Sequence, residues 1–319
     1  MAVVADAQRP RGRWRDALEE RRFLAPLLIS PAVLYIVLLV GAPLGLALYL
    51  SLTDATAGSL SGHFVGMHNY ADVWHSENFR RALRNTIFFT LVSQAVVLVG
   101  AAILAHRLVR PFRGRWLLRF LVVLPWAAPV ALGTIGWLWI FEATLSVANW
   151  SLVHLQTGLF GHLGLDLVDP IDPPQWLGRP HLAMAAVIMV HSWRILPFAT
   201  VIFIAGLASV PAEVDDAAKM DGATGLRKLF YVTLPLQLPI ALVALLFGIV
   251  FTATDITVVY ILTNGGPFNQ TQTLPMWAFQ TGIRGSSLGD GAAISLYLLP
   301  ILVLVSVGML YFARRAEVT

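Results

Sequence analysis

Six apolar runs, longer than 18 residues, decide what this 319-residue chain can fold into. Hydrophobic residues make up 57% of the sequence and charged residues only 13%, about half the charged fraction of a soluble domain. The runs do not alternate with period two, so they predict membrane-spanning helices rather than barrel strands. We therefore expect an all-α integral membrane protein in a lipid bilayer, with six transmembrane helices at about 23–52, 85–105, 117–141, 181–207, 236–262 and 290–312.

The polar segments between these runs predict the orientation. Lys and Arg gather on the cytoplasmic side of membrane proteins. Most of the 22 lie in the amino-terminal segment 1–22, the loops 106–119 and 208–235, and the tail 314–319. The others are Arg80, Arg81, Arg84, Arg179, Arg194 and Arg284. We expect both termini and the loop 208–235 in the cytoplasm, with the transmembrane domain 23–313 in a bacterial or archaeal cell (inner) membrane. The basic residues are then topology markers and do not indicate nucleic acid.

The sequence shows no motif for catalysis, nucleotide binding or metal binding. It has no cysteine, and therefore no disulfide or thiol nucleophile. A phosphate-binding loop requires Gly-x-x-x-x-Gly-Lys-[Ser/Thr], and neither Lys219 nor Lys228 follows a glycine. The histidines are scattered without metal-ligand spacing, and no hydrolase motif is present. We expect a chain that is not an enzyme and binds no metal or cofactor, so that any ATPase must be a partner.

Two charged residues lie well inside predicted membrane helices. Arg194 interrupts the fourth run and Asp255 the fifth. A charge at the membrane centre costs about 2.5–3.5 kcal/mol on insertion scales, so such residues usually face a cavity or each other. One interpretation is a structural ion pair between the two helices. The other is the polar wall of a substrate cavity, to which Thr252 also contributes and in which Trp193 stacks on a sugar ring.

A polar stretch, Ser209 to Pro239, separates the fourth and fifth runs. Ser209 is expected to cap a short helix, and Gly222 to break the chain sharply before a second short helix at 225–233. At helical spacing, one face of the first helix carries Val214, Ala217, Ala218 and Asp221. Small residues on that face would allow another surface to approach closely. We interpret this stretch as the place where a partner protein exerts force on the chain.

The same stretch carries a recognisable pattern. Asp216-Ala217-Ala218-x-x-Asp221-Gly222-Ala223, followed by Phe230, Leu234-Pro235 and Pro239, resembles the EAA coupling motif of binding-protein-dependent ABC importer permeases. Asp216 stands where that family usually has Glu. Further matches resemble the carbohydrate, maltose-type branch and its first permease subunit. They are Phe64-Val65-Gly66-x-x-Asn69-Tyr70, Asn85-Thr86, Trp193 with Pro197-Phe198, Ala205-Gly206-Leu207, Pro211, and Asp255 with Tyr260 to Pro267.

This resemblance implies a larger machine with the ABC importer permease fold. A second permease subunit would complete the path, and two cytoplasmic ATPases holding ATP and Mg would receive the coupling helices. An extracytoplasmic binding protein would deliver a mono- or oligosaccharide. The family places substrate contacts on the helices flanking the coupling loop, where Trp193, Arg194, Phe198, Thr252 and Asp255 fall.

Two other functions stay open at this point. A self-sufficient secondary transporter would use Arg194 and Asp255 as an ion-coupling pair, although such carriers commonly show internal repeats that this sequence lacks. An ABC importer of a non-sugar solute, such as a glycerol phosphate or a polyamine, is the other. One Arg and one Asp suit a neutral polyol better than a strongly charged solute.

Overall fold

The computed structural model describes residues 21–59, 62–142, 146–160, 169 and 172–318, so the predicted segment 1–22 lies almost wholly outside the described residues. The regular elements of the described part are helices, which confirms the expected all-α class. In chain order they are α2 (Arg21–Ile36), η1 (Val37–Gly41), α3 (Ala42–Ser51), α4 (His68–His75), α5 (Glu77–Val109), α6 (Arg115–Ala127), α7 (Val130–Ile140), α8 (Val147–Leu155), η2 (Gln156–Phe160), α9 (Pro180–Ala208), α10 (Ala212–Met220), α11 (Gly225–Lys228), η4 (Leu229–Thr233), α12 (Leu234–Ala253), α13 (Thr257–Leu262), α14 (Leu274–Phe279), η5 (Gln280–Arg284) and α15 (Leu288–Val318).

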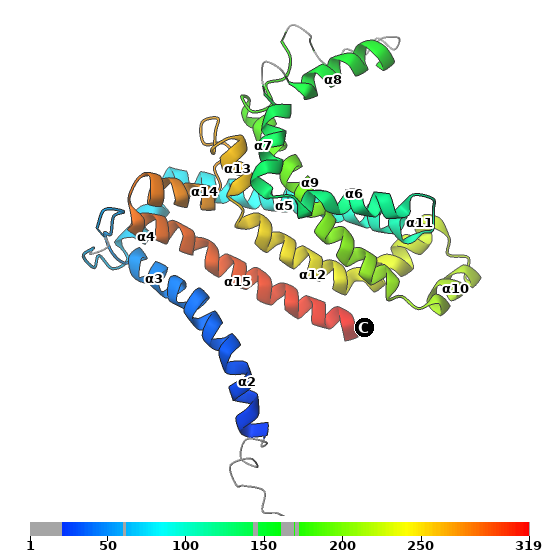
Figure 1. Cartoon of the computed structure of the whole chain (residues 1–319), viewed down its shortest axis with the longest axis horizontal. Coiled ribbons are helices and arrows are strands. Elements are labelled where there is room, and N and C mark those ends of the chain that lie inside the picture. Colours follow the sequence, from blue (N-terminus) through cyan, green and yellow to red (C-terminus); the bar gives the residue numbers. More distant parts are fainter. Residues whose placement is uncertain (1–20, 60–61, 143–145, 161–168, 170–171, 319) are drawn as a thin grey trace, which may run out of the picture.

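Four long helices form the body of the molecule. Figure 1 shows α9, α12 and α15 beside one another, and α5 packs against both α9 and α12. The short helices α10 and α11 lie at one end of this bundle, and α4 and α14 lie at the other. The carboxyl-terminal end of α15 is directed toward the end that carries α10. The expected cytoplasmic segments at 208–235 and at the tail thus lie toward one end.

Small side chains let the central helices approach closely. Ala101 and Ala105 of α5 are fully buried against Ala199 and Phe203 of α9 and Ala244 of α12. In lipid the hydrophobic effect does not drive helices together, because lipid tails are as apolar as the side chains. Small residues at helix contacts instead let the backbones approach closely and gain van der Waals contact. A second cluster joins the amino-terminal half of α9 to α13 and α14, through Val187, Val190, Val258, Val259 and Met276.

Within the described residues, five helices are long and apolar enough to span a membrane: Leu24–Ser51, Glu77–Val109, Pro180–Ala208, Leu229–Ala253 and Leu288–Arg315. The expected third span, 117–141, is instead two helices, α6 and α7, that meet at 98°. Pro129 explains the bend, because it lacks an N–H and keeps Ala128 extended, with ψ of 144°. A sixth span exists only if this bent pair crosses as one.

The expected fifth span, 236–262, also departs from one continuous helix. Helix α12 ends at Ala253, and α13 begins at Thr257. The hydroxyls of Thr252 and Thr254 donate to the carbonyls of Gly248 and Val250, and Asp255 bonds to the backbone ahead of it. Such side chains compete with the helical ladder, which accounts for the break.

The first helix stands apart from the rest. Figure 1 shows α2 running away from the bundle, and the most apolar stretch of Leu24–Ser51 buries nothing inside this chain. Only its carboxyl-terminal part, α3, packs on α15. Asn69 of α4 fixes that end of α3, because its amide donates to the carbonyls of Ser51 and Thr53.

One glycine contact tests this packing. A Cβ atom at Gly291 of α15 would lie 2.5 Å from the Cα atom of Gly282, whereas a Cβ at Gly308 of the same helix meets nothing within 4 Å. Gly291→Ala should therefore destabilise the subunit by about 1–3 kcal/mol through overpacking. Gly308→Ala is the matched control and should be neutral or slightly stabilising. Thermal unfolding of the purified protein in detergent measures both, and equal melting temperatures would contradict the predicted α15–η5 contact.

Candidate functional site

The segment between α9 and α12 folds into two short helices, as its sequence predicted. Helix α10 ends at Met220, and Gly222 has φ of +70°, a conformation that favours glycine. The N–H of Ala223 donates to Ala218, and the N–H of Gly222 donates to Lys219. This pair of bonds is a Schellman motif with Gly222 at its left-handed position. The predicted sharp break at Gly222 is therefore present, with a defined hydrogen-bonded closure.

The alanines of this segment have two different roles. Ala218 and Ala223 are buried, at the two positions where a Schellman motif brings apolar side chains together. Ala217, Asp216 and Asp221 are exposed, and Val214 is half-buried. The predicted docking face of Val214, Ala217, Ala218 and Asp221 is wrong in one respect: Ala218 points inward to close the helix end, and only Ala217 of the two alanines faces outward.

The beginning of α10 also differs from expectation. Ser209 does not cap it, because the Ser209 hydroxyl donates back to the carbonyl of Gly206 at the end of α9. Pro211 precedes α10 with no side-chain capping bond. Farther along the helix, Asp216 and Lys219 form an ion pair of 2.9 Å with both side chains exposed. Such an exposed pair contributes at most about 1 kcal/mol, so the Asp216 carboxylate is readily available to another cation.

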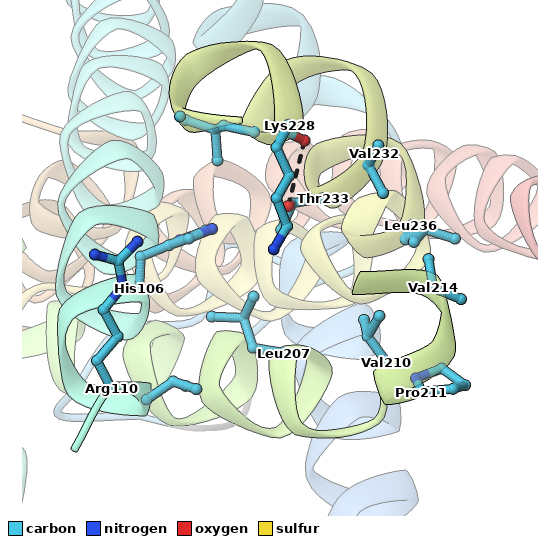
Figure 2. Close-up of a pocket in the computed structure, with 13 residues that line it drawn as sticks. His106, Arg110, Leu207, Val210, Pro211, Val214, Lys228, Val232, Thr233 and Leu236 are labelled. Atoms are coloured by element: carbon cyan, nitrogen blue, oxygen red, sulfur yellow. Dashed lines mark hydrogen bonds between the residues drawn. The ribbon is translucent and has the colours of Figure 1, made fainter. Parts of the chain in front are cut away.

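A pocket of about 470 Å³ separates this segment from the ends of the long helices. Figure 2 shows its walls: α5 and α9 on one side, and α10, α11, η4 and the start of α12 on the other. Its lining residues are His106, Val109, Arg110, Leu207, Val210, Pro211, Val214, Gly225, Lys228, Leu229, Val232, Thr233 and Leu236. We name α10 and α11 the coupling segment, after the motif that their sequence resembles. The pocket separates this segment in part from the helix bundle.

A buried polar cluster lies where α12 ends. The Thr252 hydroxyl is at its centre: Gln94 of α5 donates to it over 2.7 Å, and His191 of α9 lies 2.9 Å away through Nε2. Thr252 itself donates to the carbonyl of Gly248. A hydroxyl has one proton and two lone pairs, so Thr252 accepts from both neighbours and His191 carries its proton on Nε2. Three long helices thus meet at a single, fully satisfied hydroxyl.

Asp255 continues this cluster one turn farther along. One carboxylate oxygen pairs with the guanidinium of Arg194, and the other accepts from the N–H of Val258 in the first turn of α13. The Nδ1 atom of His191 lies 3.8 Å from Asp255. The Asp255 side chain is 5% exposed and that of Arg194 is 18% exposed. The two charges that the sequence placed inside the membrane therefore face each other and join α9 to the break between α12 and α13.

Aromatic rings flank the ion pair along α9. Trp193 packs edge-on against Trp137 of α7, with ring centroids 5.6 Å apart. Phe198 stacks on Trp126 of α6 at 5.1 Å and meets Phe251 of α12 at 5.6 Å. Trp193, Arg194 and Phe198 are all half-buried. The structure thus joins Arg194 to Asp255, whereas Trp193 and Phe198 contact other aromatic rings beside this pair along α9. Thr252 is fully buried.

Two members of the cluster, Gln94 and His191, were missed from the sequence. His191 read as one of several scattered histidines, and Gln94 was passed over inside an apolar run. A polar residue within a membrane helix is a signal in its own right, because lipid offers it no partner. That signal was available for both. Among the described residues, no group of three His, Cys, Asp or Glu side chains could hold a metal ion.

Comparison with known proteins identifies the family. Residues 97–318 match the family model described as "Binding-protein-dependent transport system inner membrane component". The chain is 29% identical to the sulfoquinovosyl glycerol transport system permease protein SmoG of Agrobacterium fabrum, over 99% of this chain and 98% of that protein. It is 34% identical to a probable ABC transporter permease protein of Sinorhizobium fredii, over 83% of this chain and 82% of that one.

Other similarities agree. The trehalose/maltose transport system permease protein MalF of Thermococcus litoralis is 28% identical over 86% of this chain and 88% of its own length. Among solved structures, a chain of a bacterial ABC transporter involved in the import of the acidic polysaccharide alginate superposes with a TM-score of 0.75, at 17% identity, covering 95% of this chain and 98% of that chain. The chain therefore belongs to the inner membrane components of binding-protein-dependent transport systems, the permease subunits of ABC importers.

Proposed function

We propose that this permease subunit forms half of the translocation path of an importer for a mono- or oligosaccharide. A second permease subunit supplies the other half, and an extracytoplasmic binding protein delivers the solute. Two cytoplasmic ATPases hold ATP and Mg, for which the sequence of this chain has no phosphate-binding loop. The observation that carries the proposal is the coupling segment α10–α11, which stands off the bundle between α9 and α12. Helix α9 holds Arg194, and Asp255 lies directly after the end of α12.

The proposed topology places the α10 end of the bundle in the cytoplasm, with both termini on that side. The basic residues of the α5–α6 turn and of the coupling segment support this orientation. Asp216, Ala217 and Asp221 then face the ATPase, with Val214 at the edge of the contact. Ala218, Gly222 and Ala223 do not form this face. They close the carboxyl-terminal end of α10 and so set the angle at which α10 meets the ATPase.

Force on α10 has a short path into the membrane. Three residues separate α9 from α10, and η4 runs directly into α12. Movement of α10 by the ATPases therefore shifts the end of α9 relative to the start of α12. The Arg194–Asp255 pair joins α9 to the break that directly follows α12, so the shift changes the geometry of the pair. We propose that this alternates the cavity between outward-facing and inward-facing forms.

The substrate class follows from the balance of charge and from the relatives. Arg194 and Asp255 neutralise each other, and the neighbouring rings of Trp193 and Phe198 offer flat apolar faces for a sugar ring. Relatives are named for sulfoquinovosyl glycerol, trehalose/maltose and diacetylchitobiose. Thr252 is then a positioning residue and not a substrate contact, because its hydroxyl is already bonded to Gln94, His191 and Gly248.

One alternative solute has a specific observation in its favour. A relative that is 28% identical over 92% of this chain is the sn-glycerol-3-phosphate transport system permease protein UgpA of Agrobacterium fabrum. A phosphate ester would need a cation that is not already neutralised, and Asp255 neutralises Arg194. A binding assay of the partner binding protein with a sugar panel and with glycerol 3-phosphate separates the two solutes.

Gly222 tests the coupling assignment. A Cβ atom there meets nothing within 4 Å, so Gly222→Val acts only through the left-handed backbone, at a cost of roughly 1–2 kcal/mol. Loosening the end of α10 should lower ATP-driven uptake at least about fivefold while the subunit remains in the membrane. Gly114→Val is the matched control, since Gly114 also has positive φ in open space, in the α5–α6 turn. Equal uptake by the two variants would refute a special role for the α10 closure.

The ion pair yields a second test, which separates its two interpretations. Asp255→Leu alone leaves Arg194 unpaired and should cost about 3–5 kcal/mol, seen as a low yield of folded subunit. The double variant Arg194→Leu with Asp255→Leu removes both charges and should restore the yield. We expect its sugar uptake to remain below one tenth of wild type, because the path has lost its polar wall. Full recovery of uptake in the double variant would assign the pair a purely structural role.

A further inference from the structure

The pocket beneath the coupling segment has a composition that the transport cycle does not explain. Three basic side chains line it, His106 and Arg110 from the end of α5 and Lys228 from α11. Among its described lining residues there is no Asp or Glu. Figure 2 shows the His106 ring and the Lys228 side chain extending from opposite walls toward the space between them.

His106 adds a directional signal. Its Nδ1 atom lies 2.7 Å from the carbonyl of Ala102. A carbonyl can only accept, so Nδ1 carries the proton and Nε2 has a lone pair in the neutral ring. This Nε2 atom is buried and has no hydrogen-bond partner among the described residues. A ligand that donates a hydroxyl would satisfy it, as buried polar groups normally are satisfied.

The rest of the lining is apolar. Most of the remaining wall is formed by Val109, Leu207, Val210, Leu229 and Leu236, and Thr233 is the one hydroxyl-bearing side chain among the described lining residues. A water-soluble sugar phosphate or nucleotide would leave many of its polar groups facing these side chains, at a cost in desolvation. A phosphate attached to an apolar chain fits both parts of the wall.

The location agrees with such a ligand. The pocket lies at the ends of the membrane-spanning helices, where phospholipid headgroups reside, and basic pockets between helices on this side bind anionic lipid headgroups. We propose that this pocket binds an anionic phospholipid whose headgroup carries a hydroxyl. Arg110 and Lys228 hold the phosphate, the hydroxyl donates to His106 Nε2, and the glycerol and first methylenes lie along the apolar wall.

Such a ligand would brace the coupling segment. One wall belongs to α5 and α9 and the other to α10, α11 and η4. A ligand in the pocket would therefore connect the coupling segment to the bundle. This inference rests on the proposed function only in placing the α10 end at the cytoplasmic surface. Lipid retention tests this inference, whereas solute uptake by the Gly222 variant tests the coupling proposal. Either proposal can therefore fail without the other.

The test uses the assembled importer in nanodiscs, with phosphatidylglycerol as the probe and phosphatidylcholine as the neutral comparison. Native mass spectrometry measures the lipid retained on this subunit. Arg110→Gln with Lys228→Gln should weaken phosphatidylglycerol retention on the order of 30-fold, at about 1 kcal/mol for each basic residue. The control, Arg113→Gln with Arg227→Gln, removes two exposed charges from the same segments that do not line the pocket, and should retain the lipid.

A milder variant covers the case in which the double variant does not assemble. His106→Phe keeps a ring but removes Nε2, and should abolish the preference for phosphatidylglycerol over phosphatidic acid, which lacks the headgroup hydroxyls. Equal loss of lipid in the pocket and control pairs would overturn the proposal in favour of general surface charge. Displacement by millimolar sn-glycerol 3-phosphate would overturn it in favour of a soluble ligand. Loss of the ATPases with unchanged lipid retention would make the pocket a subunit contact instead.

Discussion

The Thr252 hydroxyl is the junction on which this arrangement of helices depends. It accepts from Gln94 of α5 and His191 of α9 and donates within α12, so three long helices meet at one buried oxygen. Hydrogen bonds between membrane helices contribute about 0.6 kcal/mol each on average and up to about 1.7 kcal/mol. Their larger effect is on position, because an unpaired polar group in lipid would cost more than the bond contributes. The junction fixes the level at which α12 ends and Asp255 can turn toward Arg194.

From this junction to the far end of α10 the chain is nearly continuous. Helix α9 leads into α10 within three residues, and η4 passes into α12 without a break. The Schellman motif holds the end of α10 in one conformation, because Ala218 and Ala223 bury their side chains against the turn that Gly222 permits. One continuous stretch of chain therefore connects the exposed face of α10 to the Arg194–Asp255 ion pair.

Much of this could be predicted from the sequence, and the reasons for the rest are physical. Apolar run length predicted the helices, and Gly222 predicted the turn, since both depend on local properties. A kink was expected from the prolines of the third run, but neither its right-angle size at Pro129 nor the break at Thr254 could be predicted. Proline and hydroxyl residues permit a bend, and tertiary contacts decide its size. The inward turn of Ala218 was missed because helical spacing gives a shared face but not which part of it the following turn covers. Arg194 and Asp255 were expected as partners because a buried charge is costly, whereas the smaller cost of burying the neutral Gln94 and His191 side chains in lipid was overlooked.

If partner ATPases shift α9 relative to α12 through α10, one distance between these two helices must change. The chain has no cysteine, so spin labels at Met189→Cys on α9 and Val243→Cys on α12, both exposed positions, have no native competitor. Pulsed electron paramagnetic resonance on the assembled importer gives the distance distribution with and without ATP. The account predicts a resolved shift when ATP and the loaded binding protein are present, and the loss of that shift in the Gly222→Val background. An unchanged distribution in an importer that is actively transporting would contradict it.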